Sequence, residues 1–313
     1  MGPYLLRRLS VAVVSLVGVS FVTFLLIFLV PGDPAEMVAQ ARFGHDVGER
    51  EIEMVCRLEG LDQPVVFQYI KWVRHLLNLD LGYSLISRQS VLSLIWSRFP
   101  ATLLLACSSL LLSQIVAVPA GIISALRKDT WLDVVLRLFA IWGVSMPSFW
   151  FSYILIIFFA LKLRVLPVSG YGSFANLVMP SLALSLGIAG HTARLLRASI
   201  LEVLQQDYLN TARAIGIRES KIVFKYALKN AMIPVLTSVA LQLSFLLSGT
   251  VIVESIFGWP GLGKLILDGI FTRDFPVVQG CVLFVAVCFV VINVGVDLLY
   301  AWLDPRIRWE ARG

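Results

Sequence analysis

ATLLLACSSLLLSQIVAVPAGIISA, residues 101–125, is a run without a charged side chain. A helix needs about 20 apolar residues to cross a bilayer, so this run is long enough to span one. Hydrophobic residues make up 58% of the 313 residues, charged residues make up 15%, and the mean hydropathy is +0.85. This composition is too apolar for a soluble domain and predicts a polytopic membrane protein.

Six apolar runs together predict an all-α protein with six transmembrane helices. They are Ser10–Val30, Ala101–Ala125, Val134–Leu161, Leu177–Ala193, Ile233–Val253 and Val277–Tyr300. The fourth run is the weakest, because it is short and contains Gly187, Gly190 and His191. Pro147 interrupts the third run and is expected to kink it.

Basic residues in the short loops predict the orientation. The cytoplasmic set comprises Arg7, Arg8, Arg127, Lys128, the seven Lys and Arg between 194 and 229, and Arg306, Arg308 and Arg312. By the positive-inside rule, both termini are cytoplasmic. The net charge of +6 is therefore a feature of topology, and no nucleic-acid partner is expected because no basic patch lies elsewhere.

The order of the runs predicts three parts. Residues 1–98 form an uncleaved anchor helix and an external, periplasmic segment, 99–303 form the transmembrane transport core, and 304–313 form a cytoplasmic tail. Within the external segment, Val65–Leu77 is amphipathic and is expected to lie either on the membrane surface or on the helical core.

The cytoplasmic stretch NTARAIG, residues 210–216, predicts a helix-turn-helix that docks on a partner. Helical spacing places Tyr208, Thr211, Ala212 and Ile215 on one small, partly apolar face beside Asn210. Gly216 suits a left-handed helix cap. Beyond it, Ser220 is expected to cap a second helix that carries Lys221, Lys225 and Lys229 toward water or anionic headgroups. An ordinary solvated loop is the alternative.

One glycine turn imitates a nucleotide-binding loop. Residues 258–264, GWPGLGK, match the phosphate-loop pattern, but Leu265 replaces the hydroxyl residue that magnesium needs and Pro260 removes a backbone donor. The chain itself is therefore expected to bind no cofactor. His45, His75 and His191 are separated from one another and from cysteine, so no metal site is predicted either.

Several motifs resemble the dipeptide, oligopeptide and nickel permeases of ATP-binding-cassette (ABC) importers. They are LDQP at 61–64, VSMPSFW at 144–150, ARLLRAS at 193–199, ESIFGWPGLG at 254–263 and LDPRIR at 303–308. The cytoplasmic stretch resembles the family's signature loop, although Asn210 and Thr211 replace its first two residues. Within the family, the length, PVSGYG at 167–172 and the ARLLRAS run look closest to nickel-importer permeases of the B type.

This resemblance implies a type I importer permease, multi-pass in a bacterial inner membrane and not itself an enzyme. Its expected partners are a homologous second permease, two ATPase subunits that bind ATP and magnesium, an external solute-binding protein and membrane lipid. The docking residues would then be Tyr208, Asn210, Thr211, Ala212, Ile215 and Gly216. The expected solute is nickel or a metal chelate, and a dipeptide or oligopeptide is the alternative.

Polar and polarisable residues of the spans are candidates for the translocation path. They are Ser145, Met146, Pro147, Gln242 and Ser244. The same side chains would serve equally as packing contacts between helices. An ion-coupled carrier and an intramembrane enzyme are further alternatives, but the runs nearly lack the buried carboxylates or the catalytic constellation that these classes need.

Overall fold

The computed structural model describes residues 2–29, 33–44 and 47–303, so the predicted tail at 304–313 lies outside the described residues. The chain is nearly all-helical, as predicted, and the β pairing in the described part is an isolated bridge between Tyr83 and Ser90. It forms two compact units, one from residues 1–101 and 260–290 and the other from 102–259 and 291–313.

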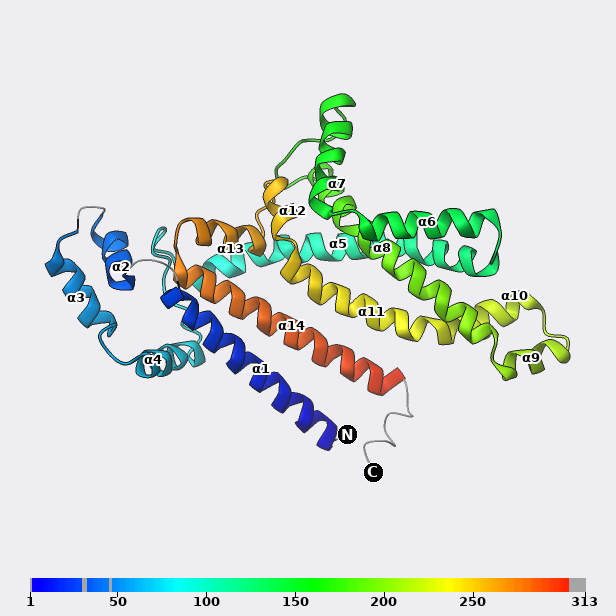
Figure 1. Cartoon of the computed structure of the whole chain (residues 1–313), viewed down its shortest axis with the longest axis horizontal. Coiled ribbons are helices and arrows are strands. Elements are labelled where there is room, and N and C mark those ends of the chain that lie inside the picture. Colours follow the sequence, from blue (N-terminus) through cyan, green and yellow to red (C-terminus); the bar gives the residue numbers. More distant parts are fainter. Residues whose placement is uncertain (1, 30–32, 45–46, 304–313) are drawn as a thin grey trace. The chain divides into compact units, whose positions relative to one another are not determined.

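Helices of the first unit come from both ends of the sequence (Figure 1). They are α1 (Gly2–Leu29), α2 (Pro34–Phe43), α3 (Glu49–Glu59), α4 (Val65–Leu77), α13 (Leu262–Phe271), the start of α5 (Val91–Leu126) and most of α14 (Phe275–Leu303). The amphipathic helix α4 has the predicted bounds. It packs on α1, where the Tyr69 hydroxyl lies 2.8 Å from Ser20 Oγ and its ring centroid lies 5.4 Å from that of Phe24.

Two contacts fix the loops of the first unit. The buried Asp274 carboxylate accepts hydrogen bonds from Ser84 Oγ at 2.5 Å and from the Leu85 amide at 3.1 Å. The Gln279 amide of α14 donates to the Thr23 carbonyl of α1 at 3.3 Å. Both contacts satisfy polar groups that would be costly to bury unpaired.

The second unit contains the remaining helices. They are the rest of α5, α6 (Trp131–Ser145), α7 (Ser148–Leu155), a π-helical turn (Ile156–Lys162), α8 (Phe174–Leu204), α9 (Asp207–Ala214), α10 (Glu219–Lys221), a second π-helical turn (Ile222–Ala227), α11 (Leu228–Gly249) and α12 (Val251–Ile256). The central helix is α8, which packs against both α6 and α11 (Figure 1).

Glycine allows α6 and α8 to approach closely. A Cβ atom added at Gly190 would collide with the Ala140 carbonyl oxygen, and one added at Gly143 would lie 3.0 Å from the Leu186 carbonyl oxygen. Small residues at such crossings let helix backbones pack together in membranes. The glycines that made the fourth run look weak therefore belong to its packing surface.

Four described helices are long and apolar enough to cross a membrane, and a bent pair makes up to five. The four lie in α5, in α8, across Glu219–Leu247 and in α14; the pair is α6 and Ser148–Lys162, bent by 103°. In α1 the apolar part, Ser10–Leu25, is shorter, so a count of six spans stays a prediction. The fourth predicted run ended at Ala193, but α8 continues to Leu204.

Candidate docking loop and translocation site

The end of α9 has the geometry that the sequence predicted. Gly216 has φ +82°, in the left-handed region. The Ile217 amide donates to the Ala212 carbonyl at 3.1 Å, and the Gly216 amide donates to the Arg213 carbonyl at 3.0 Å. These two bonds form a Schellman cap, which satisfies carbonyls that the helix end would leave unpaired. The chain reverses direction here.

Side chains hold the turn together from both sides. Leu209 is fully buried with Ile222 and Ala227. On the outside, the Arg213 guanidinium donates to both Glu219 oxygens, at 2.9 and 3.2 Å, and to Asn210 Oδ1 at 3.0 Å. The hydrogen bond with Glu219 raises the pKa of Arg213 above its usual value. The loop is therefore a braced hairpin rather than an open connection.

The exposed face of α9 is narrower than predicted. Tyr208 is 45% exposed, Ile215 is 72% exposed, and Thr211 is also exposed. Ala212 is half-buried and packs inward against the cluster around Leu209, because it lies three positions further along the helix. Of the four residues predicted to share this face, Tyr208, Thr211 and Ile215 are therefore the exposed ones.

Of two further predictions for this loop, the structure contradicts one and agrees with the other. Ser220 does not cap the second helix, because α10 begins at Glu219 and Arg218 is its N-cap residue. Lys221, Lys225 and Lys229 are all exposed, as the predicted basic stripe requires. The Tyr208 hydroxyl accepts a hydrogen bond from Asn230 at 2.8 Å, which ties α9 to α11.

The third span is broken at the predicted proline. Helix α6 ends at Ser145, Met146 is extended, and Pro147 precedes the first residue of α7. Ser145, Met146 and Pro147 line a shallow cavity of about 390 Å³ together with Trp142, Phe149 and Trp150. Broken helices occur at membrane depth where the freed backbone is covered by protein or faces water. Three of the five predicted path residues therefore share one site.

The other two path residues lie in different surroundings. Gln242 of α11 reaches α8, where its amide nitrogen lies 3.2 Å from His191 Nδ1 and 3.3 Å from Thr192 Oγ1. The same nitrogen lies 3.2 Å from Ser238 Oγ. Ser244 is buried, and its hydroxyl donates to the Ala240 carbonyl of its own helix. Gln242 thus belongs to a polar cluster, and Ser244 fits the packing alternative.

Sequence reasoning missed a buried ion pair. Asp133 is fully buried and accepts two hydrogen bonds from Arg197, from Nε and Nη2, each at 2.8 Å. Ser124 Oγ at 2.5 Å and the Asp129 amide at 3.1 Å complete its shell, and Arg137 Nε lies 3.5 Å away. This network joins α5, α6 and α8. Both charges fell just outside the predicted apolar runs, so they counted as loop residues.

A broken span, a polar cluster between helices and a braced hairpin are features expected of a membrane transport subunit. Residues 117–309 match the family described as binding-protein-dependent transport system inner membrane component, and residues 1–106 match the N-terminal region of such components. The chain belongs to this family. It is a multi-pass inner-membrane permease subunit of an ABC importer, a class that works with ATPase and binding-protein partners.

Relatives narrow the comparison further. The chain is 40% identical over 307 residues, 98% of its length and 99% of theirs, to the glutathione transport system permease proteins GsiC of Escherichia coli strains K12 and CFT073. The protein of the same name from Shigella boydii is 39% identical over the same coverage. These names do not confirm the nickel prediction.

Solved structures agree with the fold. Two inward-facing structures of the MetNI methionine ABC transporter superpose with a TM-score of 0.57, at 17% and 19% sequence identity. The match covers 67% and 68% of this chain and 96% and 97% of the others. The similarity supports the predicted type I importer permease fold.

Proposed function

We propose that this chain forms half of the translocation pathway of an ATP-driven importer of short anionic peptides of the glutathione type. The observation that carries the proposal is 40% identity, across almost the whole chain, to permeases of glutathione transport systems. We prefer the peptide alternative to the metal solute expected from sequence, because these relatives belong to glutathione transport systems.

A second, homologous permease supplies the other half of the path. On the cytoplasmic side, two ATPase subunits bind ATP and magnesium, and the exposed face of Tyr208, Thr211 and Ile215 inserts into one of them. The braced hairpin supports this role, because a docking element must keep its shape while force passes through it. An external binding protein delivers the solute.

Uptake by the purified importer tests the solute. The chain would be purified with its own partner subunits, reconstituted in proteoliposomes, and given binding protein, internal ATP and labelled glutathione, a labelled dipeptide or nickel with and without histidine as chelator. ATP-dependent accumulation of glutathione is expected, with no competition by excess nickel. Accumulation of nickel or its chelate that excess peptide does not reduce would overturn the proposal.

The prediction that this chain alone binds no ATP is tested separately. Helix α13 begins at Leu262, inside the stretch 258–264, and the side chain of Trp259 is buried, so these residues do not form an open loop that could wrap around a phosphate. The purified chain without partners is expected to bind no ATP in equilibrium dialysis. Saturable ATP binding by the chain alone would contradict this part of the proposal.

A further inference from the structure

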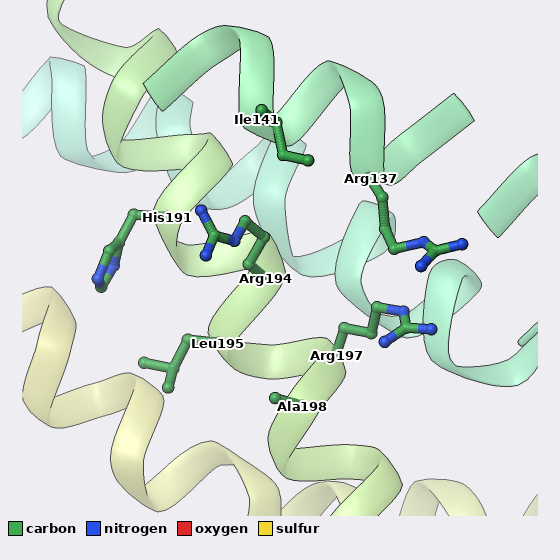
Figure 2. A pocket seen from close by; sticks show the side chains of 7 residues that line it. All are labelled: Arg137, Ile141, His191, Arg194, Leu195, Arg197 and Ala198. Atoms are coloured by element: carbon green, nitrogen blue, oxygen red, sulfur yellow. The ribbon is translucent and has the colours of Figure 1, made fainter. Parts of the chain in front are cut away.

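A second cavity of about 390 Å³ lies between α6 and α8 in the second unit, and basic side chains dominate its polar lining (Figure 2). Its lining residues are Arg137, Ile141, His191, Arg194, Leu195, Arg197 and Ala198. None of these residues was assigned to the path by the sequence. Ile141, Leu195 and Ala198 give the cavity an apolar wall.

The three arginines of the cavity have different partners. Arg197 is held by both oxygens of the buried Asp133, and Arg137 lies 3.5 Å from the same carboxylate. Arg194 is exposed and forms no hydrogen bond or ion pair with any residue that the structure describes. In Figure 2 its guanidinium lies toward His191, whereas those of Arg137 and Arg197 lie together on the other side. Arg194 is therefore available to a ligand.

The local charge favours an anion. The basic side chains that line the cavity are Arg137, Arg194 and Arg197, and the acidic side chain paired with two of them is Asp133. Three positive charges against one negative charge leave an excess of +2. In a site with low local dielectric, this excess attracts an oxyanion more strongly than it would in water.

His191 adds an imidazole donor beside Arg194. Its Nδ1 lies 3.2 Å from the Gln242 side-chain nitrogen, which can only donate. With the amide assigned in this orientation, Nδ1 accepts and the ring proton sits on Nε2. His191 and Arg194 are three residues apart on α8, so their side chains lie on neighbouring parts of one helix face. The cavity thus offers a guanidinium donor and an imidazole donor.

Polar groups extend from the cavity toward α11. Arg194 lies in α8, a helix long and apolar enough to cross a membrane. A charged side chain on such a helix is costly when it faces lipid, and in membrane proteins it marks the bundle interior, a water-filled cavity or a solute pathway. The polar cluster of Gln242, Thr192 and Ser238 adjoins the same histidine.

We propose that this cavity binds a carboxylate of the transported peptide, with Arg194 and His191 as the donors. The inference rests on the proposed function, since glutathione has two carboxylates and a net negative charge. Arg194 donates charge-assisted hydrogen bonds to the carboxylate oxygens, and the planar guanidinium matches their geometry. Asp133 holds the guanidinium of Arg197 away from the solute. Since one arginine is free, the solute is held weakly enough to leave.

The site is tested by measuring the binding of labelled glutathione to the purified importer in lipid nanodiscs. The external binding protein is left out, so that its own selection of solute does not contribute. Arg194→Gln is expected to weaken binding by about tenfold or more, the scale of a lost hydrogen bond to a charged group. Arg194→Lys should retain part of the affinity, because it keeps the charge. Arg218→Gln, a change at an exposed arginine of the cytoplasmic loop, is the matched control and should bind as wild type.

A charge-neutral competitor makes the readout specific. The diamide of glutathione, in which both carboxylates are replaced by amides, is expected not to compete with glutathione in the wild-type importer. Effective competition by the diamide would overturn the inference, because a merely steric pocket would accept both. Equal glutathione affinity in wild type and Arg194→Gln would also overturn it.

The remaining outcomes separate this inference from the proposed function. If the wild-type importer transports glutathione with its binding protein but binds none without it, the cavity inference fails and the proposed function stands. If it neither binds nor transports glutathione, the proposed function fails. Loss of binding in Arg194→Gln only in nanodiscs that contain phosphatidylglycerol would assign the cavity to a lipid phosphate and overturn the carboxylate assignment.

Discussion

Removing the Asp133 carboxylate should weaken the contact between α6 and α8 and so destabilise the protein. In Asp133→Ala, the guanidinium of Arg197 loses both of its 2.8 Å hydrogen bonds while its side chain remains only 18% exposed. Breaking a buried ion pair by removing one partner costs about 3–5 kcal/mol. Because Arg197 keeps some contact with water, we expect about 3 kcal/mol of lost stability, at the lower end of that range.

Ser124→Ala is the matched control within the same network. It removes one hydroxyl donor to Asp133 but leaves the ion pair intact. Hydrogen bonds between membrane helices are worth about 0.6 kcal/mol on average and at most about 1.7 kcal/mol. The control should therefore lose about 1 kcal/mol, roughly a third of the loss in Asp133→Ala. The two variants separate a charge effect from the loss of any single contact.

The unfolding free energy of each variant would be measured by titrating the purified chain in mixed micelles with SDS and following helical circular dichroism. The double variant Asp133→Leu with Arg197→Met should recover most of the stability, because two apolar side chains replace the pair. Equal losses in Asp133→Ala and Ser124→Ala would refute the reasoning. So would a double variant no more stable than Asp133→Ala, since no uncompensated charge would then explain the loss.

Three further changes test other parts of the molecule. Gly190→Ala should lose about 1–3 kcal/mol of unfolding free energy in the same titration, because its added Cβ would collide with the Ala140 carbonyl oxygen. Gly187→Ala, whose added Cβ would have its nearest neighbour at 3.6 Å, should lose nothing. Equal losses in the two variants would contradict this packing. Gly216→Val should abolish uptake by the reconstituted importer at normal membrane levels, because a branched residue at φ +82° costs about 1–2 kcal/mol. Ala214→Val, a change within ordinary helix, should still transport. Wild-type uptake by Gly216→Val would show that the hairpin does not couple the ATPase to the permease. Met146→Trp should fill the cavity at the helix break and block uptake, and Met146→Leu should preserve it; full transport by the tryptophan variant would place the path elsewhere.

Most of the helices could be predicted because each depends on local pattern. Bilayer thickness sets the length of an apolar run, the proline at 147 lacks an amide donor, and the glycine at 216 permits a left-handed backbone angle. Each of these signals can be read at one place in the sequence. The amphipathic stretch 65–77 was located to the residue for the same reason.

The site could be predicted only in part, because it depends on pairs far apart in the chain. Asp133 and Arg197 are separated by 64 positions, and nothing in either neighbourhood identifies the other. Positive-inside reasoning assigned Arg194 and Arg197 to a loop, since both follow a run that seemed to end at Ala193. Once Arg197 is neutralised by Asp133, the helix can continue through it. Ala212 was misplaced for a smaller reason, since helical spacing does not show which side of a short helix the hairpin buries.

The continuity of α8 has a mechanical consequence. One helix of 31 residues, about 46 Å long, carries the Asp133 partner and Arg194 and then passes through Gln205 and Gln206 into α9. A rod of this kind transmits displacement along its axis with little loss. If the hairpin docks on an ATPase as proposed, its movement would shift the guanidinium of Arg194 relative to Ile141 and would change the geometry of the proposed carboxylate site.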